Sequence, residues 1–401
     1  MKLPTEQNML NFKLLENHVQ RYINDHLQDN LAKMALKGTS FEGVQTSELI
    51  TQIEAKLKCK KKLPTWFSSK QIIYANKLNI EQSSSEITAN YKRNLIGGET
   101  LLDLAGGFGV DTYYFSKTLK EVTYCEVNKN LSEIVKHNLK ILKASNIFIK
   151  AMDGLLYIQQ KNRQYDWIYI DPSRRNKIGN KLYFIEECYP NVIENLDLLF
   201  LRSNNILIKL SPMLDIKSAL KILKNTKEVH VVAIKNEVKE LLFLLEKGYT
   251  NEAFVKAINL QTTQPNFKFK ISQEKITIAY QEPMNYLYEP NAAILKCGAF
   301  KNIAIHFKIM KLGQHTHLYT SSRITKDFPG KIYKIHKIIP YKRHNVRREI
   351  TGRKANIKTR NFPNKIKEIK KEYKILDGGN QFIFFTTSNK RKYVIICSKL
   401  V

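Results

Sequence analysis

The 401-residue chain is longer than one ordinary domain. Its 43% apolar and 10% aromatic residues suffice for several packed cores, which excludes intrinsic disorder. No apolar run reaches the roughly 20 residues that a membrane helix needs, and the polar start MKLPTEQNML lacks the apolar centre of a signal peptide, so we expect a cytoplasmic protein. The net charge of +30 is carried mostly by Lys in a chain also rich in Asn and Ile, so by itself it does not establish a nucleic-acid partner.

The first region, residues 1–94, is predicted to be helical. Apolar and aromatic side chains recur there at three- and four-residue intervals, as at Leu15, Val19, Tyr22 and Ile23. A polar connection follows at 81–85, and Ser85 is the expected N-cap of the next helix.

From residue 100 to about 245, short apolar runs alternate with helical segments such as 131–142. This alternation predicts an α/β fold with a doubly wound, Rossmann-like sheet. The expected strands are 100–104, 122–126, 147–151, 167–171, 206–210 and 229–234, with a further strand near 253–259.

After residue 266 the pattern changes to short β-like runs with turns, which predicts small α+β modules. Strands are expected at 275–279, 304–307, 331–335, 374–376, 381–387 and 393–397, with a turn at Gly378 and Gly379. Residues 331–401 carry 20 Lys and Arg against 4 Asp and Glu, a net charge of +16. Such a concentration is typical of a surface that neutralises phosphates. The alternative is a basic face that serves solubility alone.

The most specific local motif is LLDLAGGFGVDT (101–112), where a strand should end and a helix begin. Gly106, Gly107 and Gly109, with the small Ala105, permit a tight turn and close approach of a ligand to the backbone. A dinucleotide-binding loop would place a third glycine at position 112, which is Thr112 here. The motif therefore favours a ribose and an amino-acid tail over a pyrophosphate.

Acidic residues follow three successive predicted strands: Asp103, Glu126 and Asp153. Ligands of open α/β sheets bind at the carboxyl ends of the strands, so we expect the three carboxylates to converge. Asp103 and the glycine loop would hold an amino-acid tail, Glu126 the two ribose hydroxyls and Asp153 the adenine amino group. The alternative for each is a helix cap.

The fourth strand ends in DPSRR (171–175). Pro172 has no donor, so the carbonyls around Asp171 and Ser173 must find other partners, and we expect them to face a substrate. Arg174 and Arg175 could clamp a phosphate, with pairing to local acids as the alternative. Lys209, after the fifth strand, should lie nearby, or else form part of a strand-end cap.

DPSRR resembles the D-P-P-[YFR] loops of methyltransferases that modify nucleobases, with Ser173 in place of the second proline. From about Ser84 onward the chain resembles bacterial class I methyltransferases with a C-terminal THUMP-like domain. The matching strings are TANYKRNL (88–95), DLAGGFGVDT (103–112), DPSRR (171–175), KLSPMLDI (209–216), NEVKELLF (236–243), EPNAAILKCGAF (289–300), THLYTS (316–321) and RNFP (360–363).

The helical pattern of residues 1–94 and this resemblance together give four parts: a helical region (1–94), a methyltransferase domain (95–265), a ferredoxin-like module (266–325) and a basic THUMP-like domain (326–401). The resemblance alone implies the last two. It implies S-adenosylmethionine as the cofactor and RNA, ribosomal or transfer, as the partner. Asp171, Pro172 and Ser173 would orient the acceptor atom. In the THUMP-like domain, Arg343, Arg347, Arg348 and Arg353 are the expected RNA contacts.

The cysteines at positions 59, 125, 188, 297 and 397 are scattered, with no C-x-x-C pair and no histidines at ligand spacing, so neither a disulfide framework nor a metal site is expected. None lies near DPSRR, and methylation of a pyrimidine carbon normally needs a cysteine nucleophile. A nucleobase nitrogen is therefore the expected acceptor. Two alternatives stay open: a non-catalytic RNA-binding protein on a methyltransferase scaffold, and a methyltransferase that acts on DNA or protein.

Overall fold

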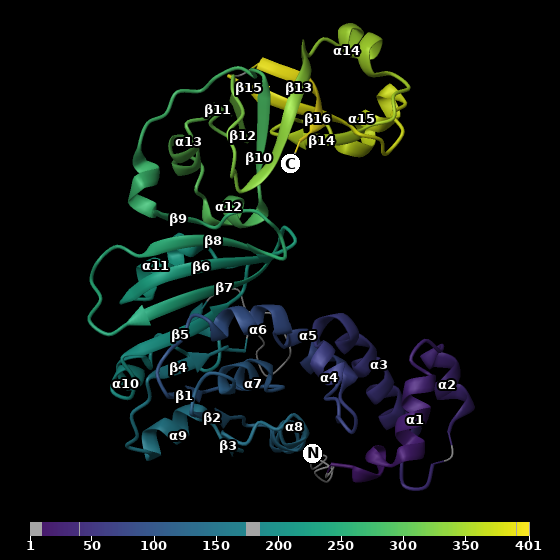
Figure 1. Ribbon diagram of the computed structural model, residues 1–401, viewed down its shortest axis with the longest axis vertical. Helices are drawn as coiled ribbons and strands as arrows, with labels where there is room; N and C mark the ends of the chain where they lie inside the picture. The colour runs from purple at the N-terminus through teal and green to yellow at the C-terminus, as the bar shows by residue number, and fades with distance from the viewer. Residues whose placement is uncertain (1–9, 40, 174–184, 390, 401) are drawn as a thin grey trace, which may run out of the picture. The chain divides into compact units, whose positions relative to one another are not determined.

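The computed structural model describes residues 10–39, 41–173, 185–389 and 391–400 (Figure 1). Two compact units divide the chain between them. The first comprises Met1–Asn225 and Phe243–Thr250, and the second comprises Thr226–Leu242 and Asn251–Val401. None of the helices in these described residues is long and apolar enough to cross a membrane.

Helices precede the first strand, as predicted for this region. They are η1 (Phe12–Leu15), α1 (Asn17–Asp25), α2 (Leu31–Lys37), α3 (Thr46–Lys62), α4 (Pro64–Ser68), α5 (Lys77–Gln82) and α6 (Glu86–Arg93). Ser85 is the N-cap of α6, because its hydroxyl accepts a 3.2 Å hydrogen bond from the backbone N–H of Thr88. Trp66 and Ala89 of this region share one buried cluster with Phe108 and Tyr113, so these helices pack onto the segment that follows β1.

In the first unit, parallel strands lie in the order β3-β2-β1-β4-β5, which confirms the predicted Rossmann-like α/β class (Figure 1). Their bounds are β1 (Thr100–Asp103), β2 (Glu121–Cys125), β3 (Ile147–Lys150), β4 (Trp167–Ile170) and β5 (Asn205–Leu210). The helices that alternate with them are α7 (Val110–Ser116), α8 (Lys129–Ile141), α9 (Gly154–Gln160), α10 (Leu196–Phe200) and α11 (Ile216–Ile222), with the short η2 (Ile185–Glu187) after β4. The strand order reverses between β1 and β4, which is where ligands bind in open sheets of this type.

The second unit begins with β6 (Thr226–Ile234), which pairs in parallel with β8 (Phe254–Leu260), and β8 pairs antiparallel with β9 (Phe267–Lys270). Residues of both units form β7 (Glu237–Glu246), a strand that the periodicity does not predict. Glu240 on β7 is buried.

A seven-stranded sheet, in the order β11-β12-β10-β13-β16-β15-β14, forms the rest of this unit. Its strands are β10 (Tyr286–Pro290), β11 (Met310–Gly313), β12 (Thr316–Ser321), β13 (Gly330–Pro340), β14 (Asn356–Arg360), β15 (Gln381–Ser388) and β16 (Arg391–Lys399). Its helices are η3 (Ile271–Lys275), α12 (Ala292–Cys297), α13 (Asn302–Phe307), α14 (Arg343–Ile350) and α15 (Ile366–Tyr373). Ser388 on β15 donates a 2.8 Å hydrogen bond to the carbonyl of Leu312 on β11. These two strands lie near opposite ends of the strand order, so the sheet is curved enough to bring them into contact.

Three predicted strands in this part are wrong. Residues 304–307 lie in helix α13, because an apolar run of four residues fits either a strand or a buried helix turn. Lys275 ends the 3-10 helix η3, and residues 276–279 enter no strand. Residues 374–376 begin with Lys374 in the left-handed conformation (φ 50°) that ends α15, and only Leu376 forms an isolated bridge.

Candidate active site

The strand order brings the predicted acids to one edge of the sheet in the first unit. Asp103 ends β1, Glu126 follows β2, Asp153 follows β3 and Asp171 follows β4. Because β3, β2, β1 and β4 are parallel neighbours, these four positions lie at adjacent carboxyl ends. Among the described residues, no three His, Cys, Asp or Glu side chains are grouped so that they could hold a metal ion.

The glycine loop after β1 turns tightly beneath this edge. The N–H of Gly106 donates to the carbonyl of Cys125 and that of Gly109 to the carbonyl of Gly106, both at 2.9 Å. A Cβ atom on Gly106 would lie 2.1 Å from the ring of Tyr124, so this position needs glycine for packing. Gly107 has a φ of 54°, and no atom lies within 4 Å of the position that a Cβ atom would take there. Its backbone therefore borders open space.

Asp103 is fully buried and organises this loop. Its carboxylate accepts a 2.6 Å hydrogen bond from the hydroxyl of Thr112 and a 3.3 Å bond from the N–H of Ala105. Burial raises the pKa of Asp103 to about 7, against the lowering effect of the Thr112 hydrogen bond. Thr112, which replaces the glycine of a dinucleotide loop, therefore binds the acid at the end of β1.

Glu126 is half-buried and accepts hydrogen bonds from the N–H groups of Gly107 at 3.1 Å and Asn128 at 2.8 Å. Burial raises the pKa of its carboxyl group. Asp153 caps α9 by accepting a 2.9 Å hydrogen bond from the N–H of Leu156, and it also accepts one from the hydroxyl of Tyr189. Both carboxylates thus have backbone partners, and a carboxylate offers about four acceptor sites, more than these partners occupy.

The segment after β4 places Asp171 against β5. The ammonium group of Lys209 on β5 binds Oδ2 of Asp171. Pro172 is buried, and the exposed Ser173 exchanges backbone hydrogen bonds of 2.6 and 3.1 Å with Tyr189. Arg174 and Arg175 lie outside the described residues.

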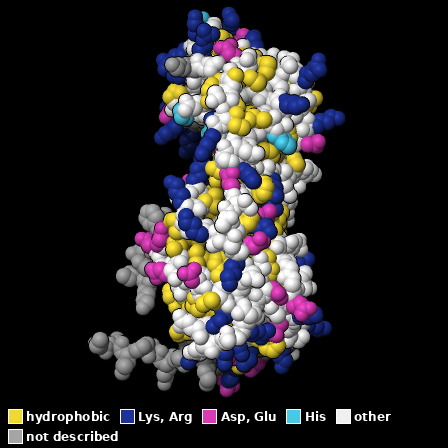
Figure 2. Space-filling model, turned by 90° about the vertical axis from the view of Figure 1, so that its left-hand side faces the viewer, with side chains coloured by type: hydrophobic (Ala, Val, Ile, Leu, Met, Phe, Trp, Pro, Cys, Tyr) yellow, Lys and Arg dark blue, Asp and Glu magenta, His cyan; other side chains and the backbone are white. Residues whose placement is uncertain are grey.

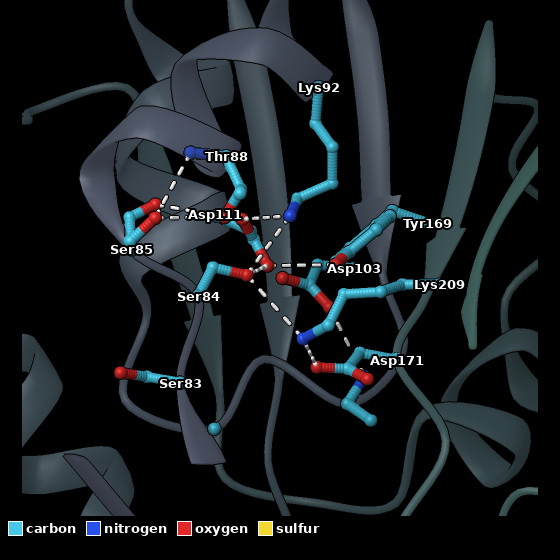
Figure 3. A network of polar contacts seen from close by, with 12 residues as sticks. Ser83, Ser84, Ser85, Thr88, Lys92, Asp103, Asp111, Tyr169, Asp171 and Lys209 are labelled. Carbon is cyan, nitrogen blue, oxygen red and sulfur yellow. Dashed lines mark hydrogen bonds and ion pairs between the residues drawn. The ribbon is translucent and has the colours of Figure 1, made fainter. Parts of the chain in front are cut away.

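Behind Lys209 lies a buried network that the sequence patterns do not predict (Figure 3). The hydroxyl of Ser84 donates to Oδ2 of Asp111 at 2.7 Å, and the hydroxyl of Tyr169 donates to the same oxygen at 2.7 Å. Lys92, with no exposed side-chain surface, lies 3.2 Å from Oδ1 of Asp111. Burial alone would raise the pKa of Asp111, but Lys92, Lys209 and the two hydroxyl groups hold it below its usual value.

A sequence signal for this network did exist. Lys92 lies in TANYKRNL and Asp111 in DLAGGFGVDT, two of the strings that carry the family resemblance. Tyr189, which binds Asp153 and pairs with Ser173, lies in no such string. Phe108 and Tyr113 are buried in the cluster that joins the helical region to the glycine loop.

The predicted RNA contacts lie in the second unit. Arg343, Arg347 and Arg348 are exposed on α14, where Arg343 and Arg347 are one turn apart. Arg343 lies 3.6 Å from Glu372 with 76% of its side chain exposed, and exposed Arg353 contacts Gln381 at 3.2 Å. Figure 2 shows Lys and Arg side chains spread over the part that contains the seven-stranded sheet, with few acidic ones between them.

Family models match two consecutive segments of this unit: a ferredoxin-like domain at residues 286–329 and a THUMP domain-like segment at residues 330–399. Both matches fall on the seven-stranded sheet, which they share.

Among solved structures, a protein from Porphyromonas gingivalis W83, provisionally described as a methyltransferase, superposes with a TM-score of 0.87 at 30% sequence identity. The match covers 98% of this chain and 100% of that one. An S-adenosylmethionine-dependent methyltransferase from Agrobacterium tumefaciens matches 40% of this chain and 60% of its own, with 16% identity and a TM-score of 0.31. An rRNA methylase from Streptococcus thermophilus matches 40% of this chain and 93% of its own, with 12% identity and a TM-score of 0.31. The last two TM-scores are too low to bear on function.

Proposed function

Because this chain belongs to the bacterial class I methyltransferase family with ferredoxin-like and THUMP-like C-terminal domains, we propose that it transfers a methyl group from S-adenosylmethionine to RNA. The observation that supports this proposal most strongly is the glycine loop beside Glu126. Gly107 presents open backbone to the edge of the sheet, and Glu126 lies directly against its N–H group.

The residues at this edge fit such a cofactor. Ala105, Gly106, Gly107 and Gly109 form the cradle, and Asp103 holds it from beneath. Glu126 is the residue for the ribose hydroxyls and Asp153 the residue for the adenine amino group, since carboxylate oxygens accept more than one hydrogen bond. When bound, the cofactor supplies an activated methyl group.

Asp171 is the residue that we assign to the acceptor. Lys209 holds one of its oxygens, so the carboxylate is fixed at the end of β4. A fixed carboxylate can accept a hydrogen bond from an exocyclic amine and so hold the amine nitrogen in position for attack. Holding two reacting groups in the right geometry can account for much of the reduction in the activation barrier. Pro172 and Ser173 set the course of the chain beside it.

A nitrogen acceptor agrees with the state of the thiols. All five cysteines are buried, including Cys188, which precedes Tyr189 and so lies near Ser173. Burial raises the pKa of Cys59 and of Cys397 to about 12, and it raises the pKa of Cys125, which ends β2, well above its usual value. A thiol of such pKa provides almost no thiolate near neutral pH. We therefore assign the methyl group to a nucleobase nitrogen. The basic THUMP-like part is the segment that we assign to RNA binding, with ribosomal or transfer RNA as the partner.

Two measurements test this function. Calorimetry should show binding of S-adenosylmethionine, and Glu126→Ala should weaken it by at least ~1 kcal/mol, because charge-assisted hydrogen bonds are lost. Glu133→Ala, an exposed change on neighbouring α8, is the matched control. Mass spectrometry of methylated nucleosides should then reveal one that is absent from the total RNA of cells lacking this protein. Binding of NAD without binding of S-adenosylmethionine would overturn the proposal, and methylation of DNA or protein alone would reassign the substrate.

A further inference from the structure

The helical region before β1 reaches into the candidate active site. Ser84, in the connection before α6, and Lys92, on α6, are both buried there (Figure 3). Trp66 of α4 also packs against Tyr113 and Phe108, with ring centroids 5.0 and 6.3 Å apart. The helical region is therefore continuous with the glycine loop and with the residues behind Asp171.

The hydroxyl of Ser84 has a fixed direction. A serine hydroxyl has one proton and two acceptor lone pairs. Its proton is donated to Asp111, so its oxygen can only accept from the two neighbouring ammonium groups, Lys92 at 3.0 Å and Lys209 at 3.4 Å. All hydrogen-bonding capacity of this hydroxyl is then used.

The ionic groups around this hydroxyl alternate in sign. Lys92 faces Asp111, and Lys209 faces Asp171. A buried charge is tolerated only when it is paired and hydrogen-bonded, so each member constrains its neighbours. Lys209 is thereby held from two sides, by Asp171 at the substrate edge and by Ser84 behind it.

We infer that Ser84 and Lys92 are positioning residues, which orient Lys209 and through it the carboxylate of Asp171. The inference rests on the proposed methyl transfer. It assigns a role to the helical region, because this region supplies two parts of the active-site framework. The effect on the reaction is geometric: the hydroxyl of Ser84 is engaged by Asp111, Lys92 and Lys209, so its loss acts by a shift in Lys209 that misplaces Asp171.

Ser84→Ala is the primary test, because it removes the hydroxyl and retains both ion pairs. Lys92→Met is less suitable, since it leaves Asp111 buried without its cation and can prevent folding. Ser83→Ala is the matched control: the hydroxyl of Ser83 donates to the carbonyl of Ile80 at 2.8 Å and lies apart from the network in Figure 3.

We expect Ser84→Ala to lower kcat for methyl transfer on the order of 10-fold to 100-fold. Its Kd for S-adenosylmethionine should stay within about 2-fold of the wild-type value, and Ser83→Ala should change neither quantity. In a Lys209→Met background the same Ser84→Ala change should have no further effect, because the link it acts through is already gone.

The outcomes separate the two proposals. If the wild type is active and Ser84→Ala leaves kcat unchanged, the positioning role alone is overturned. The same holds if Ser84→Ala lowers kcat in the Lys209→Met background as much as it does in the wild type. A parallel loss of cofactor affinity in Ser84→Ala would make the residue a structural one. A wild type that neither binds S-adenosylmethionine nor methylates RNA overturns the proposed function and this inference with it.

Discussion

The hydroxyl of Thr112 donates a 2.6 Å hydrogen bond to the carboxylate of Asp103, and both side chains are completely buried. The pair joins the end of β1 to the first turn of α7 across the glycine loop. Burial raises the pKa of Asp103 to about 7, so this acid changes its ionisation near neutral pH and not near pH 4.

Asp103 should therefore give the protein a distinctive pH dependence of stability. Between pH 4 and 7 the folded protein keeps a proton on Asp103 that the unfolded chain loses, so this residue's contribution to stability falls as pH rises through that window. Each pKa unit corresponds to about 1.4 kcal/mol, so a few kcal/mol are lost by pH 7. Asp103→Asn removes this loss. Urea unfolding between pH 5 and 8 should show the free energy of unfolding of Asp103→Asn increasing relative to that of the wild type as pH rises. A difference between the two that is independent of pH would contradict the assignment.

The glycines of the loop should respond differently to alanine. Gly106→Ala places a methyl group 2.1 Å from the buried ring of Tyr124 and should destabilise the protein by about 1–3 kcal/mol, as overpacking does. Gly107→Ala meets open space and should cost about 1 kcal/mol through its positive φ. Gly107→Ala should nevertheless weaken S-adenosylmethionine binding, because its side chain enters the space left for the ligand. Thermal unfolding and calorimetry measure the two effects separately. Equal loss of stability in both variants would show that Gly107 is also a packing position.

Asp171→Ala should leave cofactor binding nearly intact and lower methyl transfer on the order of 100-fold or more, as expected for a group that acts on the acceptor. Asp171→Asn is the informative companion, because it keeps the shape of the side chain but replaces one oxygen by a donor and removes the charge that faces Lys209. Single-turnover assays with S-adenosylmethionine at saturation measure the chemical step. Unchanged turnover in Asp171→Ala would make this residue structural.

The four arginines at positions 343, 347, 348 and 353 should govern the salt dependence of RNA binding. Each phosphate neutralised on a single strand contributes roughly −0.7 to the slope of log affinity against log salt concentration. Replacing the four by Ser should flatten that slope and weaken RNA binding, with unchanged affinity for S-adenosylmethionine.

The control for this variant removes the same charge from the first unit. Lys33, Lys37, Lys140 and Lys221 are exposed there, and their replacement by Ser should leave the slope nearly unchanged. Equal slopes and affinities for the wild type and the arginine variant would indicate that the basic segment serves solubility and that RNA is held elsewhere.

The sequence by itself was sufficient for strands β1 to β6 and β8, the N-cap at Ser85 and the set of acids at the strand ends. These features depend on local signals: apolar runs of strand length, capping residues, and glycines where the backbone must turn. Parallel order then brings Asp103, Glu126 and Asp153 together, because neighbouring strands share one carboxyl edge.

Only the tertiary structure decided what these acids contact. Ser84 and Lys209 are 125 residues apart, and Lys209 and Asp171 are 38 residues apart, so no periodicity relates them. Packing against other parts of the fold likewise decides that α13 is a helix and β7 a strand, since short apolar segments fit more than one secondary structure. A buried ammonium such as that of Lys92 is tolerated only where folding brings Asp111 and Ser84 to it, and that compensation is a property of three-dimensional packing.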